Sequence, residues 1–159
     1  KLAGATPVLW GNNEHDWGAF AVAFVKGESD GAEHGVTPPD LARVHKSETI
    51  FRAQMESVGG VLDALDAPIY GYGAAQMLPV LAYHLQTDLA FLESVLDDDP
   101  EKEGVMYGNL PLSVMPSKAA GDLSQTAILI TAVDSAQPIL RHILKGPRPR
   151  YIVPPVPTF

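Results

Sequence analysis

The 159-residue sequence contains no cysteine, which excludes disulfide bonds, thiolate metal sites and cysteine nucleophiles. No apolar run approaches the roughly 20 residues that a membrane-spanning helix needs, so we expect no membrane association. The start, Lys1-Leu2-Ala3, shows neither a methionine nor a signal-peptide pattern. These absences favour a soluble, cytoplasmic protein, and the start is compatible with an excised domain or a fragment of a longer protein.

Basic residues are few. The chain has 11 Lys and Arg against 19 Asp and Glu, a net charge of −8, so no basic stripe can neutralise a run of nucleic-acid phosphates. Part of the acidity lies in "DDDPEKE", Asp97 to Glu103, for which a solvated loop is the simplest explanation. The composition, 46% hydrophobic and 19% charged, is that of a folded globular domain.

Self-contained catalytic motifs are also absent: the sequence has no GxSxG, no Walker loop and no HExxH. Glu14-His15-Asp16 resembles a metal or acid/base cluster in composition. No second histidine stands at helical spacing from His15, so we favour a solvated turn and expect no metal site.

Residues 1–46 form an N-terminal segment with strand character. "TPVLW" and "AFAVAFV" are rich in apolar and aromatic residues and predict two strands joined by a polar turn. Thr37, followed by two prolines, predicts the N-cap of a short helix.

Residues 47–66 predict a connecting amphipathic helix, from about Ser47 to Leu65. Its apolar positions step by three and four and form one continuous stripe that needs a partner surface. These positions are Phe51, Met55, Val58, Leu62 and Leu65.

From residue 67 to residue 159 strand and helix patterns alternate, which is typical of βαβ units. "AILITAV" is apolar at nearly every position, as expected for a strand buried on both faces. We therefore predict an α/β fold, a Rossmann-like, mostly parallel sheet with flanking helices, preceded by a short β-containing segment.

One predicted strand-turn-helix, "PIYGYGAAQM", has the pattern of a phosphate-binding turn formed by Gly71, Tyr72, Gly73 and Ala74. Gly73 has no Cβ and could let a phosphate approach backbone N–H groups at the helix start. The third glycine of the dinucleotide motif is replaced by Gln76.

Asp97 is the second candidate binding residue. It ends the next predicted strand, 24 residues after Gly73, near the spacing at which an acidic residue holds a ribose hydroxyl.

Four stretches together resemble a known family: "IYGYGAA", "VLDDDPEKEG", "NLPLSV" and "PRYIVPPVP". In the same order and at similar intervals they resemble the C-terminal domain of S-adenosylmethionine-dependent nucleotide-sugar C-methyltransferases. That family typically has a GYGA turn, a V-D-x-x-P-x-K-x-G loop, a short h-P-h strand (h, hydrophobic) and a terminal G-x-x-F-I-V-P-h-P. Asp97, Pro100, Lys102 and Gly104 keep the spacing of the loop.

The resemblance implies a role in deoxysugar biosynthesis, with a nucleotide sugar (dTDP-linked or similar) held near the turn, Asp97 and Lys102. It also implies S-adenosylmethionine as the methyl donor of the full-length enzyme. The zinc-binding cysteines and the donor-binding domain of that family are not among these residues. We therefore expect no cofactor on this chain, no catalysis by it alone, and a missing catalytic domain as its partner.

The sequence departs from the family pattern after the turn. Met77 and Leu78 stand where the family has a lysine and a glycine, so no side-chain cation is available there for a phosphate.

Two other interpretations stay open. The chain could be a stand-alone Rossmann-like nucleotide or nucleotide-sugar binding module, with Asp97 on the ribose. It could also be a structural domain whose turn and apolar stripe serve only packing and homo-oligomer formation.

Overall fold

The computed structural model describes residues 5–13, 19–27, 40–146 and 148–156, with side chains described from Ala23 onward. The chain divides into two compact units, Lys1–Asp40 and Leu41–Phe159, which are described separately. Among the described residues, no helix combines the length and the apolar character needed to cross a membrane.

The first unit contains a β-hairpin. Strand β1 (Ala5–Asn13) pairs antiparallel with β2 (Ala19–Lys26), with Trp10 opposite Val22. The two predicted strands are confirmed. The Glu14-His15-Asp16 segment and the predicted N-cap Thr37 lie outside the described residues.

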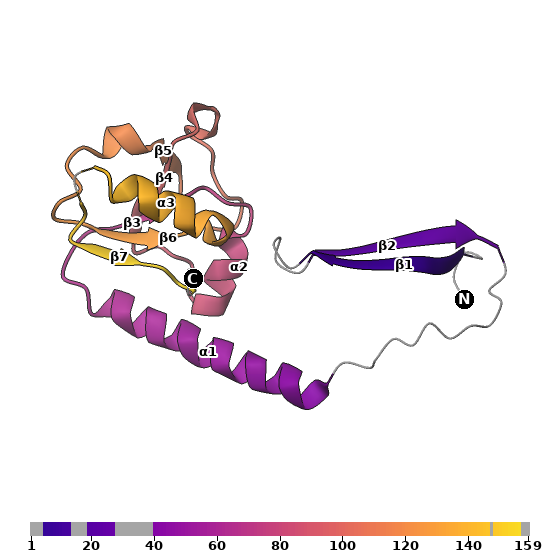
Figure 1. The fold of residues 1–159 in the computed structure, drawn as a ribbon. Coiled ribbons are helices and arrows are strands. Elements are labelled where there is room, and N and C mark those ends of the chain that lie inside the picture. The colour runs from indigo at the N-terminus through magenta and orange to yellow at the C-terminus, as the bar shows by residue number, and fades with distance from the viewer. Residues whose placement is uncertain (1–4, 14–18, 28–39, 147, 157–159) are drawn as a thin grey trace. The chain divides into compact units, whose positions relative to one another are not determined.

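The second unit alternates helices and strands along the chain (Figure 1). The long elements are α1 (Leu41–Asp63), β3 (Ile69–Tyr72), α2 (Leu78–Leu85), β4 (Leu92–Asp97), β5 (Val114–Pro116), β6 (Ala127–Ile130), α3 (Ala136–Ile143) and β7 (Tyr151–Val153). Three short 3-10 helices lie between them: η1 (Pro100–Lys102), η2 (Ser117–Ala120) and η3 (Val133–Ser135).

The five strands of this unit form one sheet in the order β5-β4-β3-β6-β7, and every pair of neighbours is parallel. The first strand lies in the middle, the next two extend the sheet to one side, and the last two extend it to the other. The chain is therefore an α/β protein of the Rossmann-like type, preceded by a short β-containing segment, as predicted.

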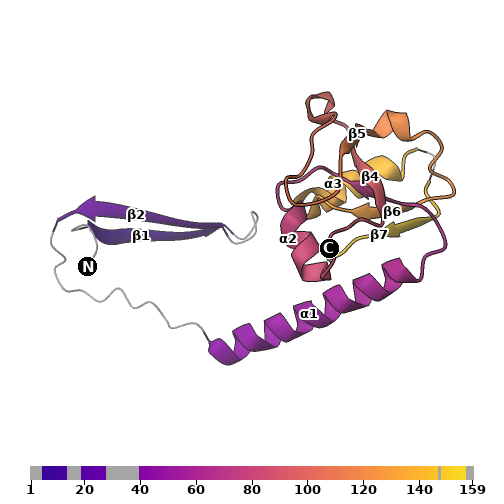
Figure 2. The same ribbon diagram turned by 180° about the vertical axis from the view of Figure 1, so that it is seen from behind.

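Helices cover both faces of this sheet, as Figures 1 and 2 show from opposite sides. On one face, Met55 and Leu62 of α1 and Leu78 and Leu81 of α2 pack with the sheet. On the other face, Ala136 and Ile143 of α3 pack against it. Strand β6 has all four residues buried, which accounts for its uniformly apolar sequence.

Helix α1 is longer than predicted at its start. A single helix begins at Leu41, so the predicted break before Ser47 is wrong. Residues 41–46 contain neither proline nor glycine, and nothing in them ends a helix. The helix also continues through Gly59 and Gly60.

Candidate functional site

A cleft of about 300 Å³ lies at the carboxyl ends of β3, β4 and β6. This is the point where the strand order reverses, and open α/β sheets bind ligands there. Its residues come from the β3 turn, the loop after β4 and the segment from β6 into α3: Tyr72, Gly73, Ala74, Ala75, Asp97, Asp98, Lys102, Ala132, Asp134, Ser135 and Ile139.

The structure brings five of the six predicted binding residues to this cleft: Tyr72, Gly73, Ala74, Asp97 and Lys102. Gly71 is not among the lining residues. It lies inside β3, where an added Cβ would come 3.0 Å from Cγ2 of Thr131. Tyr72 also belongs to β3, so the turn begins at Gly73, two residues later than predicted.

Gly73 is required for packing within the chain. Its φ of +99° is disfavoured for other residues, and an added Cβ would lie 2.4 Å from Cβ of Ala132. The space that we expected a phosphate to use is therefore filled by Ala132, with Cδ1 of Ile139 at 3.1 Å.

The backbone N–H groups of the turn already have partners. Gly73 donates to the Leu96 carbonyl at 2.8 Å, and Ala75 donates to the Gly73 carbonyl at 2.9 Å. Ala74 donates to Oδ2 of Asp97 at 2.7 Å. Helix α2 begins only at Leu78, so its N-terminus is separated from these groups. The predicted phosphate cradle of N–H donors is thus occupied by the chain itself at these three positions.

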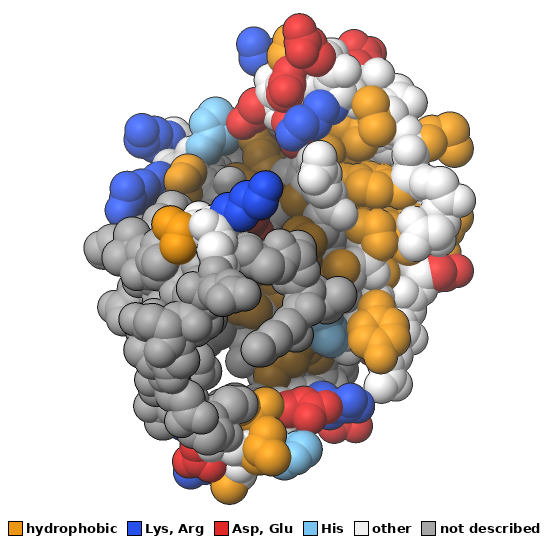
Figure 3. Space-filling model, turned by 90° about the vertical axis from the view of Figure 1, so that its right-hand side faces the viewer, with side chains coloured by type: hydrophobic (Ala, Val, Ile, Leu, Met, Phe, Trp, Pro, Cys, Tyr) orange, Lys and Arg blue, Asp and Glu red, His pale blue; other side chains and the backbone are white. Residues whose placement is uncertain are grey.

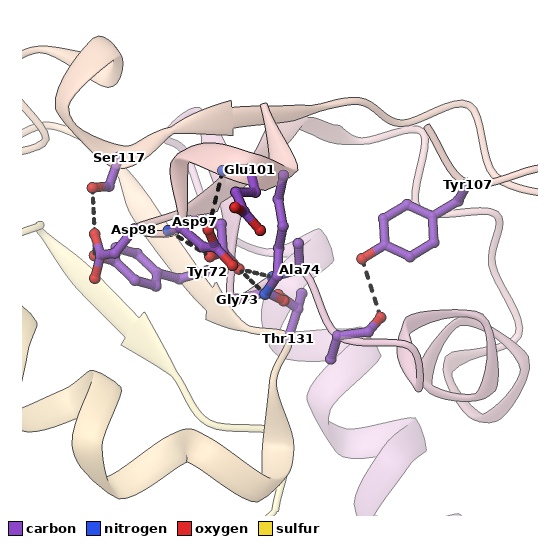
Figure 4. A network of polar contacts seen from close by, with 12 residues as sticks. Tyr72, Gly73, Ala74, Asp97, Asp98, Glu101, Tyr107, Ser117 and Thr131 are labelled. Atoms are coloured by element: carbon purple, nitrogen blue, oxygen red, sulfur yellow. Dashed lines mark hydrogen bonds and ion pairs between the residues drawn. The ribbon is translucent and has the colours of Figure 1, made fainter. Parts of the chain in front are cut away.

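Asp97 connects the turn to the loop that follows β4 (Figure 4). Its Oδ1 accepts the N–H of Asp99 at 2.9 Å, and its Oδ2 accepts both the N–H of Ala74 and Nζ of Lys102, the latter at 3.0 Å. Burial by itself raises the pKa of Asp97, but these hydrogen bonds and the lysine charge outweigh it, so the pKa lies below its usual value. Asp97 is therefore ionised at neutral pH and links the turn to the loop through its hydrogen bonds.

The loop from Asp97 to Gly104 has a local reason for its sequence. Asp99 caps η1 by accepting the N–H of Glu101, and Pro100 occupies the first turn. Gly104 has a φ of +74° and donates its N–H to the Val114 carbonyl. The loop thereby returns to β5 and holds Lys102 beside Asp97. Figure 3 shows acidic side chains gathered at the top of the view, where Figure 1 places this loop.

A second polar group, centred on Asp98, was not predicted. Oδ1 of Asp98 accepts the Tyr72 hydroxyl at 2.9 Å and also the Ser117 hydroxyl. Nε2 of His142, from α3, lies 3.8 Å from Oδ2. Burial raises the pKa of Tyr72 to about 12, and the hydrogen bond to Asp98 acts in the same direction, so Tyr72 remains a donor at neutral pH.

Two further hydroxyl groups hold the turn in place. Thr131 donates to the Gly73 carbonyl at 2.7 Å in a buried contact between residues 58 positions apart. Tyr107 donates to the Ala75 carbonyl at 3.1 Å. Sequence reasoning missed both residues because neither stands in a motif, and only the folded chain brings them to the turn.

The cleft carries more carboxylates than cations. Asp97, Asp98 and Asp134 line it together with one lysine, Lys102, which is paired with Asp97. Carboxylates accept hydrogen bonds from hydroxyl groups and repel phosphate, so the lining suits a hydroxyl-rich ligand. In the described part of the chain, no three His, Asp or Glu residues are placed to hold a metal ion.

No family model matches the chain, and a search of curated proteins finds no match.

Proposed function

We propose that residues 41–159 form the nucleotide-sugar-associated C-terminal domain of an S-adenosylmethionine-dependent sugar C-methyltransferase. In this proposal the donor-binding catalytic domain lies outside these residues. The domain holds the sugar part of a dTDP-linked or similar nucleotide sugar in the cleft between β3, β4 and β6.

The observation that carries the proposal is the meeting of two of the four stretches on which the family resemblance rests. The "IYGYGAA" turn supplies the N–H of Ala74, and the "VLDDDPEKEG" loop supplies Lys102 and Asp97, whose Oδ2 accepts from both donors. The spacing of the loop motif thus has a physical reason, because it closes one edge of the cleft.

The size and lining of the cleft support a sugar ring as its content. A volume of about 300 Å³ is at the small end of ligand sites, suited to one ring and too small for a whole nucleotide sugar. Exposed Asp134 and Ser135 offer hydrogen-bonding groups from the β6 side. The nucleotide would then extend out of the cleft.

The cleft does not fit S-adenosylmethionine in the way that Rossmann-type sites hold an adenosyl group. Such sites use the first βα turn and an acidic residue after the second strand. Here Ala132 fills the space at Gly73, and the carboxylate of Asp97 accepts hydrogen bonds from Ala74, Asp99 and Lys102. We therefore assign no methyl-transfer step to this chain.

The test is NMR titration of the chain with dTDP-glucose, UDP-glucose and S-adenosylmethionine. We expect the nucleotide sugars to shift the amide resonances of Gly73, Ala74 and Ser135 and to leave those of residues 41–50 unchanged. We expect S-adenosylmethionine to produce no shifts in the cleft. Methyl transfer by the purified chain, or nucleotide-sugar shifts confined to other surfaces, would contradict the proposal.

The alternative of a stand-alone nucleotide-binding module assigned Asp97 to a ribose hydroxyl. This role is disfavoured, because both carboxylate oxygens of Asp97 already accept hydrogen bonds within the chain.

A role in self-association is a second candidate, favoured by one observation. Leu41 and Val44 continue the helical stripe of Phe51 and Met55, yet they are 65% and 51% exposed. Figure 2 shows this first part of α1 extending beyond the sheet and α2. Sedimentation of the parent and of the double variant Leu41→Ser, Val44→Ser tests it: a parent dimer that the variant dissociates supports this role, and a parent monomer contradicts it.

A further inference from the structure

Two neighbouring carboxylates at the end of β4 have different surroundings. The side chain of Asp97 is 11% exposed, and its oxygens accept three hydrogen bonds from the chain. The side chain of Asp98 is 52% exposed and lines the cleft. A ligand hydroxyl can therefore reach Asp98, whereas Asp97 is buried and three of its acceptor positions are already used.

The hydrogen bonds of Asp98 leave one oxygen available. Both hydroxyl donors, Tyr72 and Ser117, bond to Oδ1. In the described part of the chain, Nε2 of His142 lies 3.8 Å from Oδ2. This separation is beyond a direct hydrogen bond, so Oδ2 keeps its capacity to accept one.

We propose that Asp98, and not Asp97, is the carboxylate that binds the hydroxyl groups of a sugar ring in the cleft. This inference rests on the proposed function and names the residue that selects the substrate. Tyr72 and Ser117 hold the carboxylate in position through Oδ1, and Oδ2 accepts the hydroxyl of the ligand. His142 stands on the α3 side of the same oxygen and is not among the residues that line the cleft.

The orientation of Asp98 is fixed by hydrogen bonds from two elements. Tyr72 ends β3 and Ser117 begins η2, while His142 of α3 lies nearby without a direct hydrogen bond. Figure 4 shows Asp98 beside Tyr72 and Ser117, while Asp97 lies toward Ala74. A hydroxyl acceptor held by two hydrogen bonds offers a defined geometry, and this is a requirement for discriminating between sugar hydroxyls.

The experiment compares Asp98→Asn with Asp97→Asn and with the control Asp63→Asn, an exposed aspartate at the end of α1 outside the cleft. Each variant is titrated by calorimetry with dTDP-glucose and UDP-glucose, and also with free glucose and free thymidine. Circular dichroism and thermal melts establish that each variant is folded. Loss of a charged acceptor for a hydroxyl predicts a drop in affinity of about tenfold or more for Asp98→Asn.

We expect the drop to be equal for dTDP-glucose and UDP-glucose, since the proposed contact is to the hexose and not to the ribose. The control should bind like the parent. Asp97→Asn should melt earlier, but its affinity at a temperature where it is folded should fall less than that of Asp98→Asn.

If the parent binds nucleotide sugars and folded Asp98→Asn binds them equally well, the role of Asp98 is overturned and the proposed function stands. If only the UDP-sugar loses affinity, Asp98 contacts the ribose and the hexose assignment is wrong. If the parent does not bind nucleotide sugars but binds free glucose, and Asp98→Asn abolishes that binding, the proposed function is wrong and Asp98 remains the acceptor for sugar hydroxyls. Binding of none of the four ligands overturns both.

Discussion

The floor and the rim of the cleft are built on different principles. We define the floor as the lining residues Gly73 and Asp97 together with Thr131, which bonds to Gly73; all three are buried and bonded to their own chain. We define the rim as the lining residue Asp98 together with its neighbours Ser117 and His142; these residues are more exposed, and part of their hydrogen-bonding capacity faces solvent. Both belong to the same edge of the same sheet.

This difference separates residues that build the site from residues able to bind a ligand. A buried polar group without a partner is costly, so the floor satisfies its polar atoms internally and cannot release them without loss of stability. Rim groups exchange solvent for a ligand at little cost to the fold. Substitutions in the floor should therefore change stability, and substitutions in the rim should change binding.

The largest effect is expected for Gly73→Val. The new Cβ would meet Ala132 at 2.4 Å and would have to accept a φ of +99°, so overpacking and backbone strain add together. We expect a loss of about 4 kcal/mol in the free energy of unfolding, measured by urea denaturation. Gly108→Val is the matched control, because Gly108 has nothing within 4 Å of its Cβ position. Equal stability of the two variants would contradict the packing seen at the floor.

The next largest effect is expected for Asp97→Asn. We expect a loss of about 2 to 3 kcal/mol in the free energy of unfolding at pH 7, because the buried carboxylate's bonds with Ala74 and Lys102 are weakened. The pKa of Asp97 is lowered on folding, so its contribution is complete above the usual carboxyl pKa and is lost as the pH falls through the folded value. The stability difference between parent and variant should therefore shrink below about pH 4. A difference that stays constant from pH 7 to pH 2 would show that the charge of Asp97 has no part in it.

Thr131→Val should have a smaller effect. The substitution keeps the shape of the side chain but removes the hydroxyl that donates to the Gly73 carbonyl at 2.7 Å. We expect a loss of about 1 to 2 kcal/mol by chemical denaturation, because a buried carbonyl loses a donor. Thr131→Ser keeps the hydroxyl and should recover part of this loss. If valine and serine destabilise equally, the hydrogen bond contributes nothing and the methyl contacts decide.

The smallest effect on stability is expected at the rim. Ser117→Ala removes one donor to Asp98, but Tyr72 continues to hold the same oxygen. We expect a change of about 0.5 kcal/mol or less in the free energy of unfolding. A loss as large as that of Thr131→Val would place Ser117 in the floor and remove the distinction between the two regions.

The sheet and its helices could be predicted from the sequence because each element carries its own periodicity. Strand β6 is apolar throughout, and α1 repeats apolar residues every three or four positions. The start of α1 was predicted wrongly, since residues 41–46 contain no breaker and the proline-rich stretch before them suggested a separate short helix.

The candidate site could be predicted only in part. Spacing placed Asp97 and Gly73 near each other, because carboxyl ends of parallel strands meet at one edge. Their partners could not be foreseen. Thr131 follows β6, Ser117 begins η2 and His142 lies in α3, and only the folded sheet brings them to Gly73 and Asp98. A single sequence contains no direct signal for such pairing.

The central position of β3 has a consequence for the order of folding. Its neighbour β4 follows soon in the chain, but its other neighbour, β6, arrives about 58 residues later, as the contact of Thr131 with Gly73 shows. During synthesis the β3-α2-β4 portion can assemble first, with one edge of β3 unpaired. An unpaired edge favours association with other chains. A chain shortened before Ala127 would keep this edge open permanently, so aggregation is the expected fate of such a truncation product.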